Sequence, residues 1–170
     1  ALGMEKGEPT LMHRKPRRAT EGIFSDGLGS SVIYQGIAVA ILTLVAYFTG
    51  HYIESGVWEI ANSPDGMTMA FLTLSMTEIF HSFNLRSMHE SIFSLKSKNK
   101  YLYGSLLVSM ILTASVIYID PLANAFGFAH ISLMEYLVAM ALSICIIPIV
   151  EVVKLFQRGY RNSKSLKAGR

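Results

Sequence analysis

The sequence predicts an all-α membrane protein with four antiparallel transmembrane helices. Of its 170 residues, 51% are hydrophobic and only 16% are charged, and a soluble domain usually has about 25% charged residues. Four segments are long and apolar enough to cross a bilayer, which takes about 20 residues. The basic residues gather in alternate connections between these segments, as expected for helices that cross a membrane back and forth.

The spans divide the chain into three parts. A juxtamembrane segment (1–31) precedes the four-helix transmembrane domain (32–157), and a basic tail (158–170) follows it. The predicted spans cover residues 32–52, 67–85, 101–119 and 132–156. Because the connections are short, neighbouring spans are expected to be antiparallel.

Small residues indicate how these helices pack. In the first span they lie three or four positions apart, at Gly36, Ala40, Thr43, Ala46 and Gly50. In the third span, hydroxyl residues lie four positions apart, at Ser105, Ser109 and Thr113. Such stripes let helix backbones approach closely in lipid, against each other or against helices outside this chain. The fourth span contains Pro148, which lacks a backbone donor and predicts a kink in its last third.

The distribution of Lys and Arg predicts the orientation. Of the 15 basic residues, five precede the first span, four lie between the second and third, and six lie at or beyond the end of the fourth. The connections at 53–66 and 120–131 have none. We therefore expect both termini and residues 86–100 to face the cytoplasm. The basic residues are interpreted as topology signals and lipid-headgroup contacts, and not as a nucleic-acid surface.

The chain contains no recognisable catalytic or cofactor-binding residues. It lacks a Gly-rich phosphate loop and a Cys/His metal spacing, its five histidines are scattered, and its single cysteine, Cys145, is interpreted as a packing residue.

Glu78 is the main candidate functional residue. It lies about 18 Å along the second span, on the cytoplasmic side of the midplane of a core about 30 Å thick. Ser75, His81 and Ser82 are its neighbours at helical spacing. A lone carboxylate in hydrocarbon costs several kcal/mol, so it should face protein or water. Two interpretations remain: a cation ligand or proton-titrating group, and a protonated or hydrogen-bonded packing residue.

Two other carboxylates near span ends have simpler interpretations. Glu151 precedes Lys154 by three positions and Arg158 by seven, which favours a local ion pair. Glu135 lies near the start of the fourth span, where a carboxylate suits a helix N-terminus, and it is expected to be exposed or interfacial.

Four stretches resemble P-type calcium-transporting ATPases of the sarcoplasmic-reticulum-like and bacterial type. "ALGMEKGEPTLMHRKPR" (1–17) resembles the stretch after the sixth helix of that family, and "TMAFLTLSMTEIFHSFNLRS" (68–87) resembles the eighth helix. "YIDPLANAFGF" (118–128) resembles the segment after the ninth helix, and "EVVKLFQR" (151–158) the end of the tenth. The resemblance runs in order from residue 1 to about residue 161.

The resemblance implies that the chain is the C-terminal part of a ten-helix membrane domain, with its spans as helices seven to ten. Glu78 then occupies the position of the eighth-helix glutamate that contributes to a calcium site, and Ca²⁺ is the transported ion. The full-length protein would be an ion-translocating ATP hydrolase that also binds ATP and Mg²⁺. Its helices one to six and cytoplasmic domains would be the partners of this chain, together with membrane lipids.

Further expectations concern the extent of the chain and its location. The chain begins at Ala1 instead of Met, which suggests a piece of a longer polypeptide, and its short loops suggest a bacterial plasma membrane. The alternative is a self-contained four-helix membrane channel, an exchanger subunit or an assembly protein.

Overall fold

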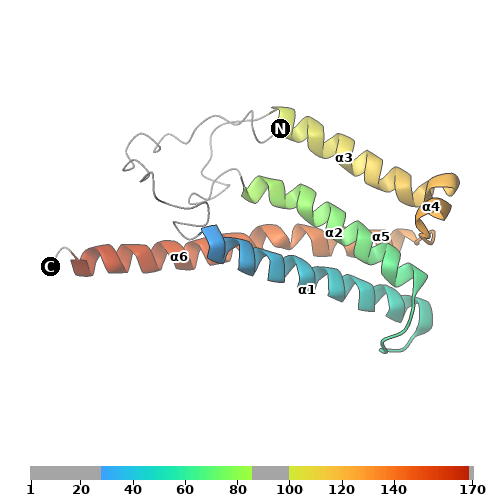
Figure 1. The fold of residues 1–170 in the computed structure, drawn as a ribbon, viewed down its shortest axis with the longest axis horizontal. Helices are drawn as coiled ribbons and strands as arrows, with labels where there is room; N and C mark the ends of the chain where they lie inside the picture. The colour runs from blue at the N-terminus through green and yellow to red at the C-terminus, as the bar shows by residue number, and fades with distance from the viewer. Residues whose placement is uncertain (1–27, 86–99, 169–170) are drawn as a thin grey trace.

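The computed structural model describes residues 28–85 and 100–168, which form helices and connecting segments without any strand. The helices are α1 (Leu28–Ser55), α2 (Pro64–Asn84), α3 (Lys100–Tyr118), α4 (Asp120–Phe126), α5 (Leu133–Ile144) and α6 (Ile146–Ala168) (Figure 1). The predicted all-α architecture is confirmed. Most of the 1–31 segment and of the 86–100 loop lies outside the described residues.

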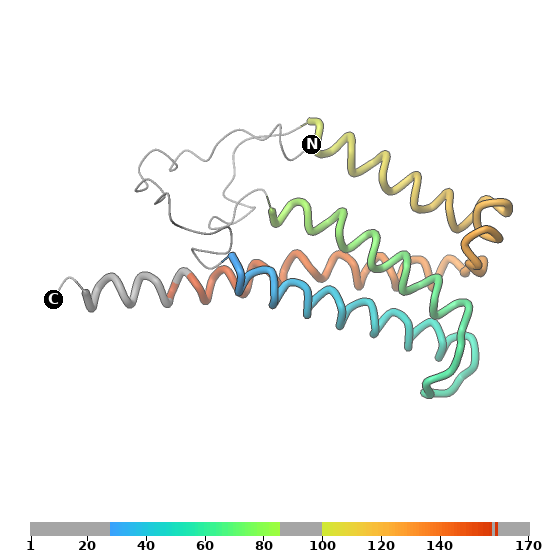
Figure 2. The backbone as a smooth tube through the Cα atoms, in the orientation of Figure 1, coloured from blue at the N-terminus to red at the C-terminus, as the bar shows by residue number. Residues whose placement is uncertain are grey.

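The long helices run side by side along one axis. Figure 2 shows the α1–α2 connection and α4 at the same end of the bundle, and Figure 1 shows α6 extending beyond the other helices at the opposite end. Neighbouring long helices therefore run antiparallel, as predicted. Helix α2 packs against α1, α3, α5 and α6, so it is the inner helix of the group.

Three helical stretches of the described residues are long and apolar enough to cross a membrane: Leu28–Ser55, Lys100–Tyr118 and Leu133–Gln157. Helix α2, predicted at 67–85, is present with 21 residues but is not apolar enough to be counted among them. Nine of its residues are buried, against two of the 19 residues of α3. An enclosed helix presents less surface to lipid, so its polar side chains are tolerated.

Pro148 interrupts the fourth predicted span. Helix α5 ends at Ile144 and α6 begins at Ile146, with Cys145 between them. The Cys145 N–H donates to the carbonyl oxygens of Ala141 and Leu142, at 3.3 and 3.1 Å. Because proline has no N–H, Pro148 cannot donate to the carbonyl of Ile144, four residues earlier. The predicted disturbance is thus a one-residue break close to Pro148.

The structure contains more helix than was predicted in two places. Helix α6 continues to Ala168, so the predicted basic tail is helical to that residue. The 120–131 connection contains α4, which was not predicted. Pro121 lies in the first turn of this helix, and Gly127 follows its last residue in the left-handed conformation with φ 72°.

Two apolar clusters form the core. The first cluster joins Met69, Leu72 and Met76 of α2 to Ile117 of α3, Ile131 before α5 and Ala139 of α5. The second cluster joins Val39 and Leu42 of α1 to Ile146 and Val150 of α6. Phe80 of α2 packs against both clusters. The helix that carries Glu78 is therefore held from several sides.

The predicted small residues of α1 pack against other helices only in the C-terminal half of α1. Ala46 and Gly50 are buried, whereas Gly36 and Ala40 are exposed. A Cβ atom added to Gly50 would lie 2.9 Å from the Cα atom of Gly66, and one added to Gly36 would meet nothing within 4 Å. The close crossing of α1 and α2 is therefore at the end near their short connection.

Candidate cation site on helix α2

Glu78 lies on the face of α2 that the described helices leave open. Its side chain is exposed, and those of Ser75 and Ser82 on the same side are partly buried. His81, predicted to belong to this polar stripe, is only 6% exposed and points into the bundle. The predicted stripe is therefore divided, and Glu78 does not face the interior formed by this chain.

Glu78 has few companions of the kind that bind metal ions. No group of three or more His, Cys, Asp or Glu side chains that could hold a metal ion is found among residues 28–85 and 100–168. Calcium takes six to eight oxygen ligands. Glu78 can therefore supply one or two oxygen atoms to a calcium site, and the remaining ligands have to come from elsewhere.

The opposite face of α2 carries buried hydroxyl groups. Thr73 and Thr77 are completely buried, and their Oγ1 atoms have no hydrogen-bond partner among the described residues. The Ser143 Oγ of α5 lies 3.1 Å from the carbonyl oxygen of Thr73 and 2.7 Å from that of Ala139. This contact is a polar connection between α2 and α5 near the middle of the bundle.

Further along this inner side, polar side chains connect α1 and α2. The His81 Nε2 lies 3.2 Å from the Gln35 Oε1, and the His81 Nδ1 lies 3.3 Å from the Asn84 Nδ2. The Gln35 Nε2 donates to the Tyr34 hydroxyl at 3.1 Å. Such interhelical contacts hold membrane helices together. These contacts were not predicted, although the polar residues Gln35 and Asn84 inside apolar spans are a sequence signal for them.

Lys154 extends the network to α6. Its Nζ donates to the carbonyl oxygen of Asn84 at 2.9 Å and lies 3.7 Å from the Glu151 Oε1. The predicted Glu151–Lys154 pair is therefore confirmed. The interpretation of Lys154 as a topology signal and headgroup contact is corrected, because its side chain is 4% exposed and bound to α2.

At the other end of the bundle, carboxylates stabilise helix starts. Glu135 and Ser132 form a capping box: the Ser132 N–H donates to the Glu135 Oε2 at 2.7 Å, and the Glu135 N–H donates to the Ser132 Oγ at 3.3 Å. The expected position of Glu135 at a helix N-terminus is confirmed, but the expected exposure is wrong, since it is 4% exposed. The Ser63 hydroxyl donates to Glu54, and its oxygen caps α2 by accepting from Gly66 N–H.

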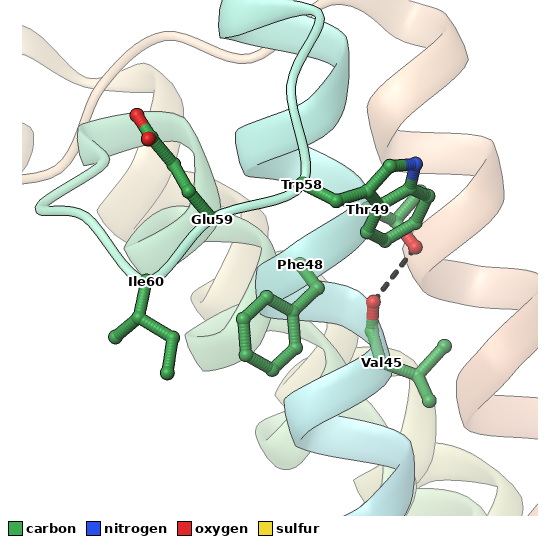
Figure 3. A pocket seen from close by; sticks show the side chains of 6 residues that line it. All are labelled: Val45, Phe48, Thr49, Trp58, Glu59 and Ile60. Carbon is green, nitrogen blue, oxygen red and sulfur yellow. Dashed lines mark hydrogen bonds between the residues drawn. The ribbon is translucent and has the colours of Figure 1, made fainter.

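An apolar pocket lies on the outside of α1 at the same end. Val45, Phe48, Thr49, Trp58, Glu59 and Ile60 line its volume of about 460 Å³ (Figure 3). The Thr49 hydroxyl donates to the carbonyl of Val45 at 2.7 Å, so it is bonded within its own helix. Trp58 stacks on Tyr52 with ring centroids 4.8 Å apart. Aromatic side chains at this level are typical of a membrane interface.

The apolar, antiparallel helices define the chain as an all-α domain of an integral membrane protein. The chain belongs to the family described as "Cation transporting ATPase, C-terminus", whose model matches residues 1–156. The resemblance to the C-terminal membrane region of P-type calcium-transporting ATPases is confirmed.

The curated relatives include calcium-transporting ATPases of several bacteria. The chain is 36% identical to calcium-transporting ATPase 1 of Bacillus cereus over 93% of its length, and 33% identical to a calcium-transporting ATPase of Bacillus subtilis over 84%. It is 31% identical to calcium-transporting ATPase lmo0841 of Listeria monocytogenes over 94%. These alignments cover 19%, 16% and 17% of the three relatives, so the chain spans less than a fifth of their length.

Proposed function

We propose that this chain is the C-terminal membrane region of an ATP-driven calcium pump, in which Glu78 contributes a carboxylate to an ion site. The observation that carries the proposal is the position of Glu78 on the face of α2 that the described helices leave open, while other described helices pack against the rest of α2. Ca²⁺ is a hard cation that prefers carboxylate oxygens. The names of the bacterial relatives support calcium as the transported ion.

The other ligands belong to the remainder of the same pump. Helices one to six of the full-length protein would cover the open face of α2 and enclose Glu78. A carboxylate enclosed in a membrane is stabilised by a cation or by a proton. Glu78 would therefore hold calcium in one state of the pump and a proton in another.

The rest of this chain supports α2. The core contacts of Met69, Leu72 and Met76 and the polar contacts of His81 and Asn84 hold α2 within the bundle. ATP and Mg²⁺ bind to cytoplasmic domains of the full-length protein, where phosphoryl transfer requires positioned phosphate-binding groups. The protein lies in a bacterial plasma membrane with both termini of this chain in the cytoplasm.

Uptake of calcium by vesicles containing the purified full-length protein tests this function. The expected result is uptake that requires ATP and Mg²⁺ and that falls, at low calcium concentration, when Glu78 is replaced by Gln. Calcium flux that is independent of ATP would indicate a channel or an exchanger and would contradict the proposal.

A further inference from the structure

Helices α2 and α6 are joined by two hydrogen bonds around Asn84. The Lys154 Nζ donates to the Asn84 carbonyl oxygen at 2.9 Å, and the Asn84 Nδ2 donates to the Ile146 carbonyl oxygen at 3.3 Å. All three residues are buried, with exposed fractions of 2% for Asn84, 4% for Lys154 and 0% for Ile146. One residue of α2 is thus bound by α6 through both its backbone and its side chain.

Asn84 is also the last residue of α2. The last four carbonyl groups of a helix have no partner within that helix, and they carry the negative end of the helix dipole. A lysine ammonium is therefore well matched to this carbonyl. Lys154 stabilises the end of α2 from a neighbouring helix.

The ammonium of Lys154 has little freedom to leave this position. A lysine near a membrane surface usually extends its charge into water. Here the charge is buried, and Glu151, itself only 8% exposed, lies 3.7 Å away as its counter-ion. Because a buried charge is costly without its partners, the Asn84 carbonyl and the Glu151 carboxylate together hold the ammonium in one place.

The bonds at Asn84 bear on the direction of Glu78. Glu78 and Asn84 are six positions apart, which corresponds to about 9 Å along the helix axis and to directions about 120° apart around it. Holding Asn84 against α6 therefore turns Glu78 toward the open face. Without these bonds, α2 could rotate or shift along its axis, and Glu78 would move with it.

We propose that Lys154 is a positioning residue for Glu78. By binding the end of α2, it fixes the rotation of this helix and the position of the Glu78 carboxylate along the helix axis. The inference rests on the proposed role of Glu78 in the ion site. Calcium–oxygen distances lie within about 2.3–2.6 Å, so a small displacement of one ligand weakens binding. Lys154 touches no transported ion and acts only through α2.

The experiment compares variants of the full-length pump. Lys154→Met removes the ammonium but keeps an unbranched side chain, and Lys154→Arg keeps the positive charge. Lys100→Met is the matched control, because Lys100 is an exposed lysine at the start of α3. The measurements are the calcium dependence of phosphoenzyme formation from ATP and the maximal phosphoenzyme level at saturating calcium.

The expected result for Lys154→Met is an apparent calcium affinity about tenfold weaker, with a maximal phosphoenzyme level per folded protein close to that of the wild type. Lys154→Arg should restore most of the affinity, and Lys100→Met should leave it unchanged. If Lys154→Met does not accumulate, Lys154→Gln takes its place, because its shorter, uncharged side chain should hold the Asn84 carbonyl less firmly than the ammonium does, and a weaker apparent calcium affinity is still expected. An unchanged calcium dependence in the variant that folds overturns the proposal.

A double variant separates this inference from the role of Glu78. If Lys154 acts through Glu78, Lys154→Met adds little to the loss already caused by Glu78→Gln, and the two effects are not additive. Additive effects would show that Lys154 acts by another route and would overturn the inference. If Glu78→Gln alone leaves the calcium dependence unchanged, the proposed role of Glu78 fails first, and the inference fails with it.

Discussion

Thr77 and Glu78 are adjacent on α2, yet Thr77 is completely buried and Glu78 is exposed. The two side chains point in directions about 100° apart around the helix. Thr77 faces the bundle that this chain forms, whereas Glu78 faces the region where the remainder of the pump would lie. In the proposed function, helix α2 therefore lies between the supporting bundle and the proposed ion site.

The close approach of α1 and α2 predicts that Gly50 cannot be enlarged freely. A Cβ atom there would lie 2.9 Å from both the Gly66 Cα and the Met69 Sδ. Gly50→Ala is expected to lower the free energy of unfolding by about 1–3 kcal/mol, because the packed helices have to separate. Thermal unfolding of the full-length protein in detergent measures this effect.

Gly36→Ala is the matched control for this packing prediction. It adds the same methyl group to the same helix, at a position where nothing lies within 4 Å. Its unfolding temperature should be unchanged or slightly raised, since alanine favours helix over glycine. Equal destabilisation by both substitutions would show that the Gly50–Gly66 contact is not what limits side-chain size.

The orientation predicted from Lys and Arg is tested by cysteine labelling in a Cys145→Ser background. Asn62, between α1 and α2, and Lys100, at the start of α3, are both exposed. In intact cells, an impermeant thiol reagent is expected to label Asn62→Cys but not Lys100→Cys. Opening the membrane should make both sites reactive. Labelling of Lys100→Cys from outside intact cells would contradict the predicted topology.

The isolated 170-residue chain is expected to have no ATPase activity of its own. Phosphoryl transfer needs bound Mg²⁺ and groups that hold the phosphates, and the sequence contains no recognisable phosphate-binding motif. An ATPase assay of the purified chain in detergent, with and without calcium, measures this. Calcium-stimulated turnover that remains after removal of contaminating ATPases would contradict the proposal that ATP is hydrolysed by cytoplasmic domains outside this chain.

The sequence predicted the helices well because their length and hydropathy are set by the bilayer. It also predicted the disturbance at Pro148, since a missing N–H acts locally. Two further local signals were available but unused: Pro121 with Gly127 around α4, and Ser132 with Glu135 as a capping box.

Which faces are buried could not be predicted in the same way. In a membrane protein, lipid is as apolar as the core, so hydrophobic residues do not mark the inner face of a helix. The inward direction of His81, the burial of Lys154 and the outward direction of Glu78 depend on how α2 packs against α1, α5 and α6. These are tertiary contacts between residues far apart in the sequence, such as the 70 positions that separate Asn84 from Lys154.

The calcium dependence of phosphoenzyme formation by the full-length pump, wild type against Glu78→Gln, tests the central claim most directly. Gln keeps the size of the side chain but removes the charge that would bind calcium. The account predicts an apparent calcium affinity at least about tenfold weaker, equivalent to about 1.4 kcal/mol, with folding retained. Identical calcium dependence in the two proteins across pH would contradict it and would leave Glu78 as a packing residue on the open face of α2.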